Sequence, residues 1–341
     1  MACLLSGAVV GYMSRADGKP ITTNSVFGNE YNKYIYKEKG HGERYCDDKN
    51  LTLRREWRKM TQAEKRQFIQ GVKCLKHKPS KTRPTGTLFD DFAFVAALIG
   101  RHSTSIILGG PARANDVGGG IPFWDWTKDT EALGRSPLLN EMPGFGGDGN
   151  PLSQFDNGTS GAYCVTDGNF RNHKATFDFE VETGIVGRPH CISRHFDPSD
   201  PDGRRVGALV APSAITEIVA LPDYATFSEV MQNTTSGPAA VIPRWVQGDM
   251  ARYTAPNDVL YFLHLAQLDR IWWIWQHQIT ALRAIDYSGL RRNDREDLAT
   301  LQDNLSLGTL IAPDVDVNDM MWAQMGFLCY TYYLKQDSPS H

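Results

Sequence analysis

Histidine is the residue type in this chain best suited to chemistry, because an imidazole can bind a metal ion or transfer a proton near neutral pH. His264 lies in an apolar, Trp-rich segment, and His102 follows a shorter apolar segment. If the two rings face each other inside the fold, they could hold a single zinc ion together with water or a carboxylate. Without a metal, His264 could still act as a general acid or base. The alternative is that both are hydrogen-bonded core histidines.

Other polar residues have simpler structural interpretations. His190 and His195 flank Cys191, and we interpret them as surface histidines beside a disulfide. Asp90 and Asp91 precede an apolar run, where carboxylates favour the positive end of a helix dipole. Neither pair is expected to be catalytic.

The six cysteines are too few for a disulfide scaffold, but four of them flank recognisable segments. Cys46 and Cys74 border a helical pattern and Cys164 and Cys191 border a loop, so both pairs could form disulfides. Buried free thiols in a reducing compartment are the alternative. Four Asn-x-Ser/Thr sequons favour the secretory route: Asn50, Asn157, Asn233 and Asn304.

The composition excludes two classes of partner. The formal charge is -3 over 341 residues, and no run of Lys and Arg is interleaved with aromatic residues, so we do not expect nucleic acid as a partner. No stretch reaches the roughly 18 to 20 apolar residues that span a bilayer, so no membrane span is predicted. The apolar run at residues 1–12 lacks the basic start of a typical signal peptide.

The elements that must position these groups are mainly helical. Thr61 and Glu64 form a capping-box pattern, and apolar residues then recur at helical spacing until Pro79. Within a later helix, we interpret Asp269 and Arg270 as a structural ion pair or cap. Further helices are expected at residues 89–99, 224–231 and 257–282.

The chain divides into a poorly ordered leader at residues 1–42 and a single domain at residues 43–341. Residues 109–201 are rich in glycine turns, so we expect them to wrap around a helical core instead of forming one. The aromatic segment from residue 310 onward is expected to pack back onto the body.

The segment 256–276, PNDVLYFLHLAQLDRIWWIWQ, resembles the second metal-binding helix of fungal tyrosinases. In that family, an Asn-Asp-Pro turn precedes a helix with a His-His pair, an Asp-Arg pair and a Trp-rich tail. Further segments resemble the family in collinear order: REWR at 55–58, CL at 74–75, FDDF at 89–92, IPFWDW at 121–126, CVTDG at 164–168 and PHC at 189–191. On these motifs, the chain is identified as a diverged member of the tyrosinase, catechol oxidase and hemocyanin superfamily.

This resemblance implies a mostly α fold, with a central four-helix bundle and long irregular loops wrapped around it. In the family, three histidines hold each of two coppers, and neutral imidazoles suit copper. The copper pair binds dioxygen and oxidises phenols. The expected protein is therefore an oxidase or monooxygenase of fungal specialised metabolism, such as mycotoxin biosynthesis, that acts on a small-molecule phenol or a tyrosine-containing peptide.

In the first copper site, the ligand positions depart from the family pattern. Ala96 stands at the first ligand position and has no donor atom. His102 stands near the second and could still bind a metal. The Trp-His-Arg helix that supplies the third ligand has no counterpart, because the Gly-rich stretch 109–120 leads directly to the IPFWDW segment.

The second copper site departs further. The expected His-x-x-x-His pair falls at Ala239 and Pro243, and the third ligand position is Leu265. His264 occupies the companion position, which borders the substrate pocket in relatives. The chain is therefore predicted to lack a two-copper centre, although His102 and His264 could still hold one metal ion.

Two explanations stay open for the missing helix: real divergence, or an error in the gene's predicted splicing. Ala96 and Leu265 favour divergence, because the residues on both sides of each still fit the family. Three classes of function also stay open. They are a phenol oxidase, which ancestry favours, a repurposed non-redox enzyme with one metal or none, and a catalytically inactive scaffold or partner protein.

Overall fold

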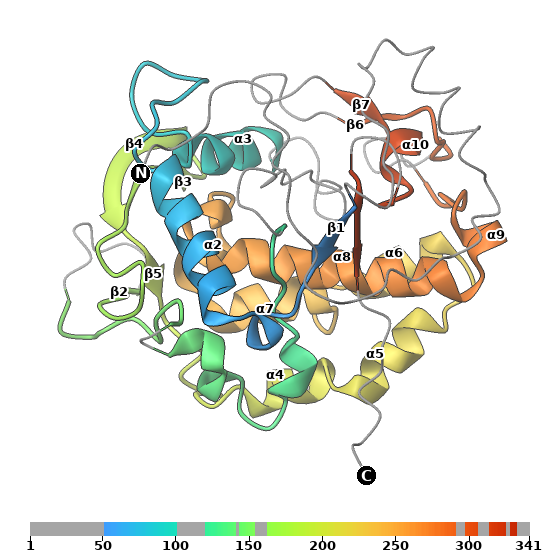
Figure 1. Ribbon diagram of the computed structural model, residues 1–341, viewed down its shortest axis with the longest axis horizontal. Helices are drawn as coiled ribbons and strands as arrows, with labels where there is room; N and C mark the ends of the chain where they lie inside the picture. The colour runs from blue at the N-terminus through green and yellow to red at the C-terminus, as the bar shows by residue number, and fades with distance from the viewer. Residues whose placement is uncertain are drawn as a thin grey trace.

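The computed structural model describes residues 51–100, 120–140, 143–153, 162–290, 297–305, 314–324 and 328–332. The predicted leader at residues 1–42 and the candidate His102 lie outside the described residues. The described part is helix-rich, and its longest helix, α8 (Leu260–Gln278), runs through the middle of the molecule (Figure 1). The prediction of a mainly helical protein is confirmed.

Helix α2 (Gln62–Leu75) begins where the sequence predicts it. The Thr61 hydroxyl accepts a hydrogen bond from the N–H of Glu64, and the Glu64 carboxylate accepts one from the N–H of Thr61. This reciprocal pair satisfies two N–H groups that have no partner within a helix. The buried face of α2 consists of Phe68, Ile69 and Val72.

Helix α3 (Asp90–Gly100) lies within one residue of the predicted range and starts at the two carboxylates. Asp90 accepts hydrogen bonds from the N–H and the hydroxyl of Thr87, and Asp91 accepts one from the N–H of Lys81. Both aspartates are fully buried. Their hydrogen bonds join the preceding loop to the first turn of α3. This agrees with the prediction that Asp90 and Asp91 are structural residues.

The central helix α8 is shorter than the predicted range 257–282. At its start, Asn257 belongs to a separate 3-10 turn (Ala255–Asn257), and the Asp258 carboxylate accepts the N–H of Leu260. At its end, the extended backbone of Ile279 separates it from the short helix α9 (Thr280–Arg283). Buried residues occur on every side of α8, as expected for a helix at the centre of a core.

Four shorter helices follow the central loops: α4 (Arg204–Leu209), α5 (Pro212–Val219), α6 (Tyr224–Met231) and α7 (Pro238–Val246). Helix α6 coincides with its predicted range, whereas α4, α5 and α7 were not predicted from the sequence. Helices α5 and α7 both pack against α8. The central four-helix bundle stays a prediction.

The described strands form two-stranded sheets. The longest is the antiparallel hairpin of β3 (Lys174–Glu180) and β4 (Gly184–Cys191) at the edge of the molecule (Figure 1). Strand β1 (Thr52–Arg54) pairs in parallel with β8 (Tyr330–Tyr332), so the aromatic C-terminal segment packs back onto the body as predicted. The remaining elements are β2 (Tyr163–Cys164) with β5 (Ser193–Arg194), β6 (Asn304–Leu305) with β7 (Val315–Asp316), and helix α10 (Val317–Met320).

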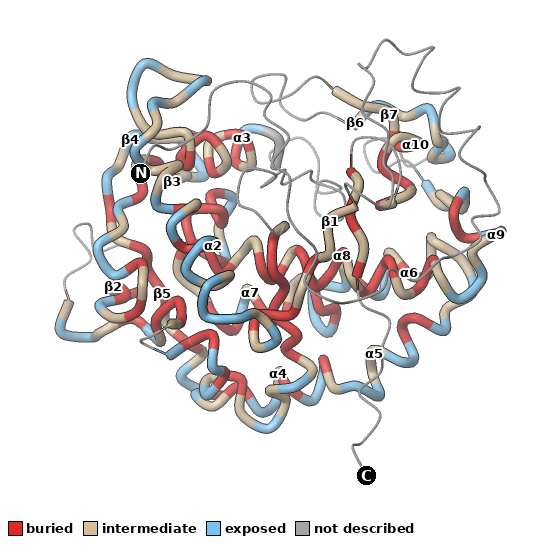
Figure 2. Tube along the Cα trace, in the orientation of Figure 1, coloured by how far each residue is buried: buried red, intermediate tan, exposed pale blue. Residues whose placement is uncertain are grey.

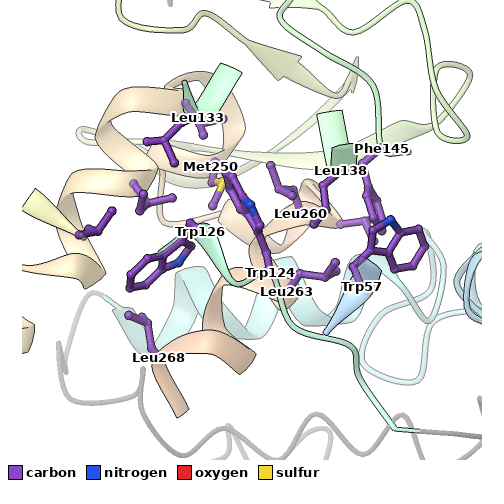
Figure 3. Close-up of a cluster of buried hydrophobic side chains, with 14 of the residues drawn as sticks. Trp57, Trp124, Trp126, Leu133, Leu138, Phe145, Met250, Leu260, Leu263 and Leu268 are labelled. Carbon is purple, nitrogen blue, oxygen red and sulfur yellow. The ribbon is translucent and has the colours of Figure 1, made fainter. Parts of the chain in front are cut away.

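Large aromatic side chains fill the core around α8. Trp124 and Trp126 are fully buried, and the ring of Trp57 lies 4.7 Å from that of Phe145 (Figure 3). Figure 2 shows α8 as predominantly buried, whereas the helices below it alternate between buried and exposed residues. Among the described residues, no helix has both the length and the apolarity to cross a membrane.

Candidate functional site

His264 lies on α8 with its side chain fully buried. Neither ring nitrogen makes a hydrogen bond of normal geometry with a described residue, although the backbone of Ala239 on α7 lies beside the ring. Burial lowers the pKa of His264 to about 3, so the ring is neutral at physiological pH. A neutral imidazole can bind a metal, but with so low a pKa it is a weak base.

The positions expected from the resemblance to hold the second-site ligands lie on α7 and α8, next to this ring. Ala239 and Pro243 on α7, and Leu265 on α8, are all half-buried. Ala239 and Leu265 also pack against the main core. None of the three side chains has an atom that binds a metal, so these positions do not fit a copper ion.

The residues near the expected first copper site are aromatic. Ala96 on α3 is half-buried and also has no donor atom. Nearby, the ring of Phe262 on α8 meets the rings of Phe92 and Phe89 edge to face, with centroids 5.6 Å and 5.9 Å apart. Phe92 and Phe262 are half-buried. Edge-to-face contact is the geometry in which aromatic rings attract one another, so these rings join α3 and α8.

Within the residues that the structure describes, no three His, Cys, Asp or Glu side chains come together in a group that could hold a metal ion. His102 lies outside those residues, so a single metal held by His102 and His264 stays a prediction. Four of the expected ligand positions lie within the described residues and carry Ala96, Ala239, Pro243 and Leu265. None of these side chains has a donor atom that would fit a copper ion, and the assignment of these positions as ligand positions stays a prediction.

His190 is buried, and its interpretation as a surface histidine was wrong. Its Nε2 lies 2.9 Å from Asp249, which is 59 residues away in sequence, and its Nδ1 lies 2.7 Å from the Arg188 carbonyl. Burial alone would lower the pKa of His190, but the hydrogen bond and charge of Asp249 raise it above the ordinary value. Asp249 also accepts the N–H of Ser193 at 2.7 Å. The sequence motif gave no signal for this partner, because a local pattern cannot reveal a contact between distant segments.

Lys76 and His173 are half-buried and form a second polar group with the buried Asp90, which no sequence motif predicted. The Lys76 ammonium donates to Asp90 at 2.9 Å and to the Lys174 carbonyl at 2.8 Å. The ring of His173 lies edge to face with Phe89 at 5.0 Å. Burial, followed by the charge of Lys76, lowers the pKa of His173 to about 3. The group thus combines an ion pair with a neutral imidazole, and it joins α2, α3 and β3.

Asp269 is a structural residue, as predicted, but its partner is not the adjacent Arg270. The guanidinium of Arg54 on β1 lies 3.0 Å from its carboxylate, and the hydroxyls of Tyr330 and Tyr332 donate to it at 2.8 Å and 2.5 Å. Consecutive helix residues do not face each other, which explains why the adjacent arginine is not the partner.

The predicted disulfide Cys164–Cys191 is present, with a Cα–Cα distance of 5.5 Å. Cys74 and Cys329 are disulfide-bonded as well, and no described cysteine is free. Cys46 lies outside the described residues, so its pairing with Cys74 stays a prediction. Disulfides persist in oxidising compartments, which is consistent with the secretory route.

Residues 106–278 match a protein-family model described as the common central domain of tyrosinase. Tyrosinase ustQ of Aspergillus flavus is 36% identical over 297 residues, which cover 83% of this chain and 80% of the relative. The tyrosinase-like protein phomQ1 of Diaporthe leptostromiformis is 32% identical over 309 residues, which cover 82% and 77%.

A solved structure with a similar fold is a variant of the polyphenol oxidase from Thermothelomyces thermophila. The TM-score is 0.69 at 21% sequence identity, and the match covers 88% of this chain and 94% of that one. At this identity, the likeness concerns the fold and not the chemistry.

Proposed function

The chain belongs to the tyrosinase family, and we propose that it serves fungal specialised metabolism by acting on a phenolic ring without a complete two-copper centre. The relatives reported above are a fungal tyrosinase and a fungal tyrosinase-like protein, which supports a phenol as the ligand class. Candidate ligands are a tyrosine side chain within a peptide and a polyketide phenol.

One observation carries the proposal. The second-site positions Ala239, Pro243 and Leu265 lie on α7 and α8, two helices that pack together, and none of the three has a donor atom. Copper binding in the family depends on imidazole nitrogens. With these side chains, His264 would be left as the sole imidazole of the second site, and one histidine cannot hold copper in the family's geometry.

The aromatic surface supports recognition of a ring. Phe92 on α3 and Phe262 on α8 are half-buried, and their rings meet edge to face with centroids 5.6 Å apart. We propose that a phenol packs against these rings in the same geometry.

His264 contributes little as an acid in this proposal. With a pKa of about 3, its neutral ring has no proton to release easily at physiological pH, and a general acid or base works best with a pKa near that pH. The described residues therefore favour recognition of the ring over acid–base chemistry at His264, and a role as a scaffold or partner protein is the second candidate.

Secretion fits this function. The Cys164–Cys191 disulfide and the disulfide-bonded Cys74 and Cys329 support maturation in an oxidising compartment. We therefore propose that the protein passes through the secretory pathway of its cell.

The test is the metal content and oxygen chemistry of the full chain secreted from a fungal host. We expect copper and zinc well below one ion per chain by mass spectrometry, and no oxygen uptake with catechol. Calorimetry should detect binding of N-acetyl-tyrosine amide. N-acetyl-phenylalanine amide, which lacks the hydroxyl, is the matched control ligand and should bind more weakly.

A control variant shows that the assay can detect copper in this chain. The substitutions Ala239→His, Pro243→His and Leu265→His place three imidazoles at the second-site positions, and this variant should gain about one copper per chain. Two coppers per unmodified chain together with oxygen uptake would contradict the proposal and establish a working phenol oxidase. Binding of neither aromatic amide would leave the scaffold role.

A further inference from the structure

Helix α7 contains a proline in its interior. Pro243 lies six residues into the helix, which runs from Pro238 to Val246. A proline has no backbone N–H, so it cannot donate to the carbonyl four residues earlier, which here belongs to Ala239. Pro243 therefore removes the regular helical donor of the half-buried Ala239, so a replacement donor to its carbonyl would stabilise the helix.

His264 of α8 lies next to this carbonyl. Its side chain is fully buried, the backbone of Ala239 lies beside its ring, and no described group satisfies either ring nitrogen with normal geometry. A neutral imidazole has one N–H donor and one acceptor nitrogen. The Ala239 carbonyl of α7 thus lacks the backbone donor that a regular helix would supply, and the His264 ring N–H lacks an acceptor of normal geometry.

We propose that in solution His264 donates its ring N–H to the carbonyl of Ala239 and so replaces the backbone hydrogen bond that Pro243 removes. His264 is then a structural residue that holds α7 against α8. The positions of the former copper ligands form a metal-free joint between the helices. Ala239 supplies the acceptor, Pro243 removes the competing donor, and Leu265 makes the surroundings apolar.

This joint goes beyond the proposed function, because it does not depend on which ring the protein binds. It gives His264 a reason to be polar in a fully buried position that disfavours its charged form. It also predicts that the helix proline and the histidine are coupled energetically, although they lie on different helices.

A double-mutant cycle on the full chain tests the coupling. Urea unfolding is measured for the natural protein, His264→Leu, Pro243→Ala and the double variant, all in the presence of a chelator. In the natural background, His264→Leu leaves the Ala239 carbonyl without a donor. In the Pro243→Ala background, the N–H of residue 243 can serve that carbonyl, so the histidine should matter less.

We expect His264→Leu to raise the unfolding equilibrium constant about tenfold more in the natural background than in the Pro243→Ala background, as for the loss of one buried hydrogen bond. Equal effects in the two backgrounds would overturn the proposal. Copper content is measured separately, so failure of the proposed function and failure of the joint give different results.

A second measurement covers the case in which His264→Leu does not fold. In nitrogen-15 histidine-labelled protein, a ring N–H of His264 should give a resonance protected from exchange with water. In the Pro243→Ala variant, competition for the same carbonyl should move this resonance upfield and speed its exchange. An unprotected ring N–H in the natural protein would contradict the joint.

Discussion

The guanidinium of Arg54 lies 3.0 Å from the carboxylate of Asp269, although 215 residues separate the two in the sequence. Both side chains are buried. The Tyr330 ring lies 3.4 Å from the guanidinium carbon of Arg54, and the Tyr332 hydroxyl donates to Asp269. These four side chains join β1 and β8 to the central helix α8.

Removing Arg54 should therefore destabilise the protein strongly. Burial raises the pKa of Asp269, and the positive charge of Arg54 opposes that effect, so Arg54→Met leaves a buried carboxyl group without its counter-charge. We expect a loss of roughly 3 to 5 kcal/mol in the free energy of unfolding, measured by urea titration.

The neighbouring Arg55 provides the matched control. It pairs with Glu64 at 3.1 Å, but both side chains are about one-third exposed. Arg55→Met should cost at most about 1 kcal/mol, because water screens an exposed ion pair. Similar losses for the two variants would show that the Arg54–Asp269 pair is no stronger than an ordinary surface pair.

The His190–Asp249 pair should make stability depend on pH. Asp249 raises the pKa of His190 in the folded protein, so the folded state binds this proton more tightly than the unfolded chain does. The contribution is complete below the unfolded pKa of about 6.5 and is lost as pH rises through the higher folded value. We expect the stability difference between the natural protein and His190→Gln to shrink from pH 6 to pH 9 in urea titrations.

A glutamine at position 190 separates the effect of the proton from the loss of the side chain. His190→Gln retains a donor toward Asp249 but cannot titrate. A constant difference between His190→Gln and the natural protein across the pH range would mean that His190 does not gain stability from its proton.

Gln247 has a backbone conformation that suits glycine. Its φ of 58° and ψ of -156° fall in a region that side chains with a Cβ rarely adopt. We expect Gln247→Gly to stabilise the protein by about 1 kcal/mol in urea unfolding, because relief of strain exceeds the added entropy of the unfolded chain.

Two control substitutions should lower the stability of the protein instead of raising it. Gln232→Gly, at a φ of -98°, should destabilise the protein, because no strain is relieved there. Gly248→Ala should destabilise it more, since its Cβ would lie 2.1 Å from the Ser193 carbonyl oxygen. A loss of stability in Gln247→Gly would mean that the Gln side chain makes contacts worth more than the strain.

Local signals predicted the helices that carry their own caps. Helix α2 was predicted closely because its Thr61–Glu64 capping pattern is visible in sequence, and α6 was predicted from its apolar spacing, with the Asp223 cap found in the structure. Helix α7 was missed because it is short and has Pro243 in its interior, a residue that normally ends a helix. Packing against α8, which no local window contains, outweighs this preference.

The site was only partly predictable for a related reason. The identities of Ala239, Pro243 and Leu265 are visible once the motifs are aligned, so their lack of donor atoms could be stated from sequence. The partners of Asp269 and His190 could not, because each comes from a distant segment and is set by the fold. His264 is fully buried, which fits both a core histidine and a metal-binding or catalytic one, so its role stays a prediction.

The turn between α6 and α7 offers a test of the secretory route. Asn233 begins an Asn-Thr-Thr sequon and is exposed, and its side-chain oxygen accepts the N–H groups of Thr235 and Ser236 at 2.9 Å and 3.0 Å. We expect an N-linked glycan on its amide nitrogen, detected as a mass loss when glycosidase treatment converts Asn233 to Asp.

Thr235→Ala should abolish this glycan without changing the turn, because the turn uses only the backbone of that residue. Thr235→Ser should retain the glycan. A secreted chain with unmodified Asn233 would contradict the prediction, and a chain retained in the cytosol would instead contradict the secretory route.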